Sequence, residues 1–299
     1  VQQQELIGAD KYSCYQVRVP SAEDGVPVPL TLVHRKDLFP GRVLDALGNR
    51  IGDSPASGSP PTSEPRPCLL FVYGAYGVNL DLHYRPEIVP LLERGWVVGF
   101  VHVRGGGELG NEWHAGGRRR NKRRSGEDFL GAADALVASG MTRPALLAAH
   151  ASSAGGLVLG YAANRRPELF RAMVMRVPFL DPAGTLQDPS LPLTTHEFDE
   201  WGDPSDPEEL ASLESWSPYS NLRPSKEFPW VLAKCALNDP RVMFWEPAKW
   251  VMRARELHEG NSKILLQVGS DGHFGPGEQH VYLNEMANEL AFIQQAFDS

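Results

Sequence analysis

One serine stands in a setting that could activate it as a nucleophile, within the stretch LLAAHASSAGGLVLG (146–160). An apolar run ends abruptly in small residues around Ser153, and a helix-compatible stretch follows. A strand, a sharp turn and a helix with serine at the apex are the parts of the G-x-S-x-G elbow, which exposes a nucleophilic hydroxyl above a parallel sheet. Ala151 stands in place of the first glycine, and Gly155 keeps the second. Taken alone, the pattern is equally typical of a small-residue turn that opens a helix.

Two further side chains that could complete this chemistry come later in the chain, each just after an apolar run. They are Asp239 and His273. Loops at the carboxyl ends of parallel strands meet at one edge of the sheet, so we expect both residues to converge on Ser153. A serine needs a neutral imidazole to take its proton, and a buried carboxylate holds that imidazole in the right tautomer. The chain order Ser, Asp, His is that of α/β-hydrolases. Asp271 is a rival acid, but it shares a loop with His273 and is less able to brace it.

A parallel sheet must position these residues, and the hydrophobic pattern predicts one. Continuous apolar runs, typical of strands buried on both faces, alternate with helical stretches. The predicted strands are 68–73, 96–103, 146–150, 172–177, 230–237 and 264–268, and the predicted helices include 125–139 and the C-terminal stretch around 283–297. The alternation predicts an α/β-hydrolase fold, a mostly parallel, doubly wound sheet with helices on both faces.

The N-terminal part has a different character. Alternating apolar residues over 12–35 predict an antiparallel hairpin, and the Gly/Pro/Ser-rich stretch 41–67 predicts a long exposed connection. We therefore expect two parts. Residues 1–66 would form a hairpin and connection packed on the hydrolase domain, and residues 67–299 would form that domain.

Length, charge and cysteine content narrow the class of protein. The chain has 299 residues, enough for one large α/β core, and a net charge of −8, which argues against a general nucleic-acid or membrane-surface binder. The thiols Cys14, Cys68 and Cys235 lie far apart without paired spacing, as is typical of reduced cysteines. No apolar stretch approaches the roughly 20 residues of a membrane span, and the N-terminus lacks a signal pattern. We expect a cytoplasmic protein.

Two motifs suggest other ligands. Gly105-x-Gly107-x-x-Gly110 follows a predicted strand like a dinucleotide fingerprint, but no apolar-periodic helix opens at its glycines. The basic run 118–124 is short on an acidic protein, which favours a solvated loop or a contact for an acidic neighbour. No His or Cys spacing is typical of a metal site. We expect no cofactor, no metal and no nucleic acid.

Several distinct motifs are spread along the chain: FVYGAYG (71–77), HVRGGGELGNEWHAGGR (102–118), SSAGG (152–156), LPLTTHEFDEWGDP (191–204), NDPRVMFWEPAKW (238–250) and GSDGHFG (269–275). Together they resemble the peptidase domain of the prolyl oligopeptidase family, and most of all its oligopeptidase B branch. The resemblance runs from about residue 12 to the C-terminus, apart from an insert near 45–66. It implies a serine peptidase that cleaves short peptides after Arg or Lys through an acyl-enzyme.

The resemblance also implies roles for individual residues. Ser153, Asp239 and His273 take the family's triad positions. Tyr73 takes the place of the tyrosine whose hydroxyl helps bind the oxyanion, and the backbone N–H of Ala154 would be the second donor.

Substrate-binding residues follow in the same way. Arg241 matches the arginine that binds a substrate backbone carbonyl. Glu197 and Asp199 fall where oligopeptidase B has two acidic residues facing the basic side chain before the cleaved bond. On composition alone, that stretch is more typical of a solvated acidic turn. Asp81 matches one of two aspartates linked with a second basic residue, whereas His83 replaces the other, so we expect a weaker preference for paired basic residues.

Other departures lie beside the triad. Ala151 and Ser152 replace two glycines before the nucleophile, and Asn238 stands where oligopeptidase B usually has a histidine. None removes a triad member.

Members of this family carry a β-propeller that covers the active site and admits only short peptides. The sequence has no blade-like repeat, and it begins about where the propeller should end and the second part of the peptidase domain should start. We therefore expect a catalytic domain or fragment of a propeller-containing protein. Two alternatives remain open: an esterase or thioesterase with the same triad, and an inactive binding module that lacks its propeller.

Overall fold

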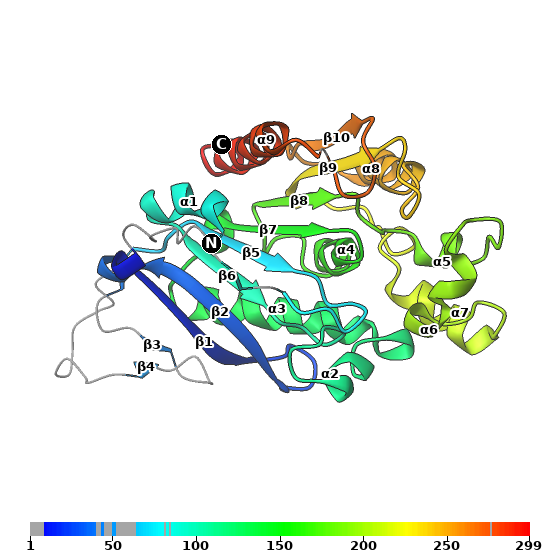
Figure 1. Cartoon of the computed structure of the whole chain (residues 1–299), viewed down its shortest axis with the longest axis horizontal. Helices are drawn as coiled ribbons and strands as arrows, with labels where there is room; N and C mark the ends of the chain where they lie inside the picture. The colour runs from blue at the N-terminus through cyan, green and yellow to red at the C-terminus, as the bar shows by residue number, and fades with distance from the viewer. Residues whose placement is uncertain are drawn as a thin grey trace, which may run out of the picture.

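An eight-stranded sheet with the order β1-β2-β6-β5-β7-β8-β9-β10 organises the protein (Figure 1). The computed structural model describes residues 9–39, 43–44, 50–51, 64–80, 82–83, 85–275 and 277–299. The strands are β1 (Tyr12–Pro20), β2 (Pro27–Arg35), β5 (Cys68–Val72), β6 (Val97–Val101), β7 (Leu147–Ser152), β8 (Ala172–Arg176), β9 (Trp230–Ala236) and β10 (Ile264–Gly269). The pairs β1–β2 and β2–β6 are antiparallel, and the others are parallel. The predicted mostly parallel sheet is confirmed, and each predicted strand is present to within two residues.

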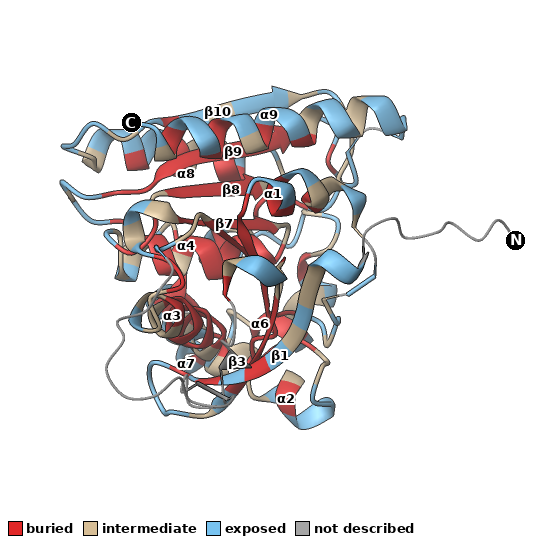
Figure 2. Cartoon of the chain, turned by 90° about the vertical axis from the view of Figure 1, so that its left-hand side faces the viewer, coloured by how far each residue is buried: buried red, intermediate tan, exposed pale blue. Residues whose placement is uncertain are grey.

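Helices cover both faces of this sheet, as predicted. They are α1 (Val89–Glu93), α2 (Asn111–Ala115), α3 (Arg123–Ala138), α4 (Gly155–Arg165), α5 (Pro182–Thr185), α6 (Phe198–Trp201), α7 (Pro207–Trp216), α8 (Trp245–Leu257) and α9 (Gln279–Phe297). Apolar side chains of α3, α4 and α8 pack on one face, and those of α1 and α9 pack on the other. Buried residues therefore line the sheet and the inner sides of the helices (Figure 2). No helix among the described residues is long and apolar enough to cross a bilayer.

The N-terminal hairpin β1–β2 extends the central sheet. Leu30 of β2 pairs with Val101 of β6, and residues of both hairpin strands belong to the same apolar core as α3. Of the predicted connection 41–67, the structure describes a two-stranded pair, β3 (Val43–Leu44) with β4 (Arg50–Ile51), and residues 64–67. The rest of the connection lies outside the described residues.

Three short helices stand at the carboxyl ends of the parallel strands. There, α5, α6 and α7 form a separate group (Figure 1), with their own apolar cluster around Trp201 and Leu213. A single 3-10 turn, Thr194–Glu197, leads directly into α6. This group closes one side of the edge at which functional loops are expected.

Candidate active site

Ser153 lies in the predicted sharp turn between β7 and α4. Its backbone has a φ of +53°, which is strained for a residue with a side chain. The Ser153 N–H donates to the carbonyl of Arg176 at 2.9 Å, and the Ser153 carbonyl accepts from the N–H groups of Gly156 at 2.8 Å and Phe179 at 3.0 Å. These three backbone hydrogen bonds hold the strained conformation in place, and the hydroxyl faces the cavity above the sheet.

Small residues are needed beside this turn. A Cβ added to Gly155 would lie 2.8 Å from the carbonyl oxygen of Val72, and one added to Gly156 would lie 2.4 Å from the Cβ of Pro178. The helix therefore starts within backbone contact of neighbouring segments.

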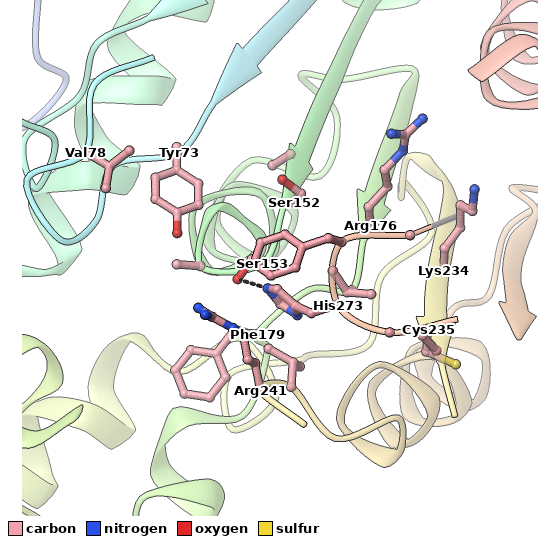
Figure 3. A pocket seen from close by; sticks show the side chains of 18 of the residues that line it. Tyr73, Val78, Ser152, Ser153, Arg176, Phe179, Lys234, Cys235, Arg241 and His273 are labelled. Atoms are coloured by element: carbon pink, nitrogen blue, oxygen red, sulfur yellow. Dashed lines mark hydrogen bonds between the residues drawn. The ribbon is translucent and has the colours of Figure 1, made fainter. Parts of the chain in front are cut away.

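The three residues of the predicted triad are joined by hydrogen bonds, and Figure 3 shows the contact between Ser153 and His273. The Nε2 atom of His273 lies 2.9 Å from the Oγ of Ser153, and its Nδ1 atom lies 2.7 Å from Oδ2 of Asp239. Because a carboxylate can only accept, Nδ1 carries the proton, and Nε2 is left to accept from the serine hydroxyl. Asp271, the rival acid, lines the cavity, but the bond to the imidazole is made by Asp239.

Asp239 is buried, and its carboxylate is fully engaged. Its Oδ1 atom accepts from the backbone N–H groups of Arg241 at 2.8 Å and Val242 at 3.0 Å. Burial raises the pKa of Asp239, but the hydrogen bond to His273 and the two amides outweigh it, so the pKa lies below its usual value. The group is therefore a carboxylate at neutral pH, able to stabilise an imidazolium. Asn238 ties this loop to the histidine loop, because its Nδ2 donates to the carbonyl of Ser270 at 2.6 Å.

The two groups predicted to bind an oxyanion lie beside Ser153 and are free to donate hydrogen bonds. Tyr73 follows β5, is half-buried and directs its hydroxyl toward Ser153 (Figure 3). Burial raises the pKa of Tyr73, only partly offset by its hydrogen bond to Ser153, so the phenol stays protonated at neutral pH. Within the described part of the chain, the N–H of Ala154 has no backbone acceptor. Both groups are therefore available as hydrogen-bond donors.

The acidic stretch contributes one carboxylate to the cavity. Glu197 lines it, and its Oε2 atom accepts from the hydroxyl of Tyr76 at 2.6 Å and the indole N–H of Trp201 at 2.8 Å. Asp199 is exposed and does not line the cavity. Glu200, which the sequence analysis did not single out, is buried and accepts from the backbone N–H of Tyr76 at 2.9 Å. The four-residue spacing of Glu197 and Trp201 is the only sequence signal for the contact between these two side chains.

The remaining substrate-binding candidates are placed differently. Arg241 is exposed at the cavity edge near His273, with its guanidinium carbon 5.1 Å from the ring centre of Phe274 (Figure 3). His83 lines the cavity, whereas Asp81 lies outside the described residues. The cavity holds about 880 Å³ and continues past His273 to Arg176 and Lys234.

Known proteins are similar to this chain in sequence and in fold. The profile of the prolyl oligopeptidase family matches residues 82–299. Protease 2 of Moraxella lacunata is 43% identical over 230 residues, 77% of this chain and 33% of that protein. Dipeptidyl aminopeptidase BI of Pseudoxanthomonas mexicana is 34% identical over 296 residues, 98% of this chain and 38% of that protein. Oligopeptidase B from Leishmania major superposes with a TM-score of 0.86 at 36% identity, covering 97% of this chain and 37% of that one. The chain thus spans about a third of the length of these relatives.

Proposed function

Because the chain belongs to the prolyl oligopeptidase family, we propose that it carries the catalytic domain of a serine peptidase that cleaves short peptides after Arg or Lys. The observation that carries the proposal is the continuous hydrogen-bonded series from Asp239 through His273 to Ser153. In this series, a fixed carboxylate, a correctly oriented imidazole and the hydroxyl of a strained, half-buried serine that lines the cavity stand in the order that nucleophilic catalysis requires.

The reaction follows from these positions. The Ser153 oxygen attacks the substrate carbonyl while Nε2 of His273 takes the hydroxyl proton. The hydroxyl of Tyr73 and the N–H of Ala154 bind the resulting oxyanion. When the C–N bond breaks, His273 gives its proton to the leaving amine, and an acyl-enzyme remains. Water, deprotonated by the same imidazole, then attacks the ester. The bond to the Ser153 oxygen breaks, His273 returns its proton to that oxygen, and the acid is released, while Asp239 stabilises each imidazolium.

Specificity for a basic residue is assigned to Glu197. Its carboxylate lines the cavity beside Tyr76. A guanidinium or ammonium group that loses its water on entering the cavity could therefore pair with this carboxylate. We give Asp199 a smaller role, because its exposed side chain would act only through its charge. Arg241 would bind a backbone carbonyl of the acyl part, and Asp81 would bind a second basic side chain.

Labelling tests the mechanism. An aryl phosphonate should label the wild-type chain at Ser153, and Ser153→Ala should abolish the labelling. Labelling that persists in the variant would refute the nucleophile. Small amide substrates that end in Arg or in Leu test specificity, and equal turnover of the two would refute the role of Glu197.

A second candidate function is ester or thioester hydrolysis by the same triad. One relative named prolyl endopeptidase-like, that of Macaca fascicularis, is 36% identical over 85% of this chain. Cleavage of an arginine ester without cleavage of the matching amide would favour this alternative. A third, an inactive binding module, predicts that no acyl-enzyme forms at all.

The context of the domain also belongs to the proposal. Because the chain spans about a third of its relatives' length, we propose that the full-length protein includes a β-propeller over the cavity. The thiols of Cys14, Cys68 and Cys235 are free, which supports a place in the reducing cytoplasm.

A further inference from the structure

We propose that the end of the cavity beyond His273 is a subsite for a carboxylate of the leaving peptide, held by Arg176 and Lys234. The proposal rests on the proposed peptidase function. It predicts a preference for substrates in which a carboxylate lies about two residues beyond the cleaved bond. We call this region the carboxylate subsite.

The subsite is built on a row of residues that crosses four neighbouring strands. Ser152 of β7 pairs with Arg176 of β8, Arg176 pairs with Lys234 of β9, and Lys234 pairs with Gln267 of β10. Residues paired in this way point to the same face of a sheet, and all four line the cavity. Neighbouring strands lie about 4.8 Å apart, so the row starts beside the nucleophile and leads away from it.

The leaving part of a substrate should lie over this row. Tyr73 follows β5, on one side of β7, whereas β8, β9 and β10 lie on the other. The oxyanion must point to Tyr73, and the leaving nitrogen must approach His273, whose loop follows β10. Glu197 contacts Tyr76, three residues beyond Tyr73, so the acyl part of the substrate occupies the Tyr73 side. The leaving peptide therefore runs over β8 and β9.

Chain geometry sets the length of that peptide. An extended residue spans roughly 3.5 Å, so two residues cover about 7 Å from the cleaved bond. The backbones of Arg176 and Lys234 lie one and two strand spacings from that of Ser152, roughly 5 and 10 Å. A leaving dipeptide is thus long enough for its C-terminal carboxylate to reach the part of the cavity that the two side chains line.

Both cations are held in place from behind by one buried carboxylate. Glu289 of α9, 0% exposed, accepts from Nε of Arg176 at 2.7 Å and from Nζ of Lys234 at 2.9 Å through the same oxygen. Its other oxygen lies 3.1 Å from Nε2 of His150. These bonds use only part of the donor capacity of a guanidinium and an ammonium. The side chains are therefore ordered before a ligand arrives, which lowers the entropic cost of binding.

Other acidic side chains near the carboxylate subsite would compete with a ligand carboxylate for the two cations. Glu285 accepts from Nζ of Lys234 at 2.9 Å, and its side chain is 24% exposed at the cavity wall. Asp271 lies on the histidine loop at the same end. Since Glu289 is fixed and buried, a ligand carboxylate has to displace Glu285 from Lys234. Removing the charge of Glu285 should consequently strengthen binding, and removing that of Lys234 should weaken it.

A binding experiment tests the subsite without turnover. In the Ser153→Ala chain, titration of the dipeptide Ala-Ala and of its C-terminal amide is followed by NMR. We expect the free acid to bind roughly tenfold more tightly, equivalent to about 1.4 kcal/mol. Lys234→Gln should reduce the ratio to near one, and Glu285→Gln should raise it, whereas Glu256→Gln, a charge removed from the exposed side of α8, should leave it unchanged. Equal binding of acid and amide would overturn the proposal.

Two further arms identify the source of the carboxylate and separate the two proposals. Ala-Asp-amide carries its carboxylate on a side chain. If it binds as tightly as Ala-Ala, the subsite accepts acidic side chains, and if it binds like Ala-Ala-amide, the subsite reads the C-terminus. Hydrolysis of an Arg-Ala-Ala substrate by the wild-type chain is measured in parallel. Acid preference without hydrolysis would refute the peptidase function alone, and hydrolysis without acid preference would refute the subsite alone.

Discussion

Replacing Tyr73 by phenylalanine isolates the contribution of one oxyanion donor. The ring packs against the apolar cluster around Trp201, and Phe keeps that packing, so the free energy of unfolding should change little. Only the hydroxyl aimed at Ser153 is lost (Figure 3). Loss of one such donor typically lowers kcat by a factor of roughly 10² to 10³, or about 3–4 kcal/mol. Since Tyr73 is half-buried and the N–H of Ala154 remains, we expect the lower end, about a hundredfold.

The assay is steady-state cleavage of an arginine anilide at several pH values. Because the oxyanion exists only in the transition state and the tetrahedral intermediate, kcat should fall while KM changes little. Tyr15→Phe is the matched control, since that hydroxyl lies 3.2 Å from His34 on the N-terminal hairpin, away from the cavity. A decrease in kcat of less than about threefold in Tyr73→Phe, or an equal decrease in Tyr15→Phe, would refute the assigned role.

Three further comparisons of variants test specificity, the protonation of a buried carboxyl group, and packing. Glu197→Gln should reduce kcat/KM for Arg over Leu substrates by roughly tenfold or more, whereas Asp199→Asn should change the ratio only about twofold, and the reverse order would contradict the assignment. Glu246 lies in the first turn of α8 and is buried. Burial raises its pKa to about 7, against 4.5 in the unfolded chain, so between these pH values the folded state keeps a proton that the unfolded state loses. Urea unfolding should therefore show wild-type stability falling by up to about 3 kcal/mol as the pH rises from 4.5 to 7, with a flatter profile in Glu246→Gln. Gly156→Ala should lower the free energy of unfolding by about 1–3 kcal/mol through overpacking against the neighbouring turn, whereas Gly277→Ala, where nothing lies within 4 Å, should cost less than about 0.5 kcal/mol.

Local sequence pattern predicted the parallel part of the sheet well, because strands buried on both faces need continuous apolar runs. In β5, every residue from Cys68 to Val72 is buried, and the same holds for β6. The hairpin was also predicted, but its pairing was not. Alternation reports that one face of a strand is buried, and it carries no information about which distant strand lies beside it, such as the pairing of Leu30 with Val101.

The catalytic candidates could be predicted from the sequence because each comes just after a strand. The contacts that hold the surrounding segments in place could not be predicted in this way. The basic run 118–124 was interpreted as a solvated loop or a contact for an acidic neighbour. Arg119 does pair with Glu209, yet Lys122 within the same run is 3% exposed and donates to the carbonyl of Gly74. Burial lowers the pKa of Lys122 to about 8. Composition could not separate these neighbours, because the direction of each side chain depends on one turn of 3-10 helix.

The strand order explains why catalysis and the carboxylate subsite can share one edge of the sheet. The residues of the proposed triad follow β7, β9 and β10, so β8 lies between the proposed nucleophile and the proposed acid without supplying a member of the triad. Its last residue, Arg176, uses its backbone carbonyl to hold the amide of Ser153 and its side chain to extend the cavity. His273 follows β10 and contacts Ser153, which follows β7. A leaving amine would therefore receive its proton at the end of the sheet between these strands, where β8 also ends. The cation of Arg176 at the end of β8 is therefore placed to act on the leaving peptide and not on the acyl group. We expect substitutions of Arg176 to change the preference among leaving groups. Hydrolysis of the acyl-enzyme should stay unchanged.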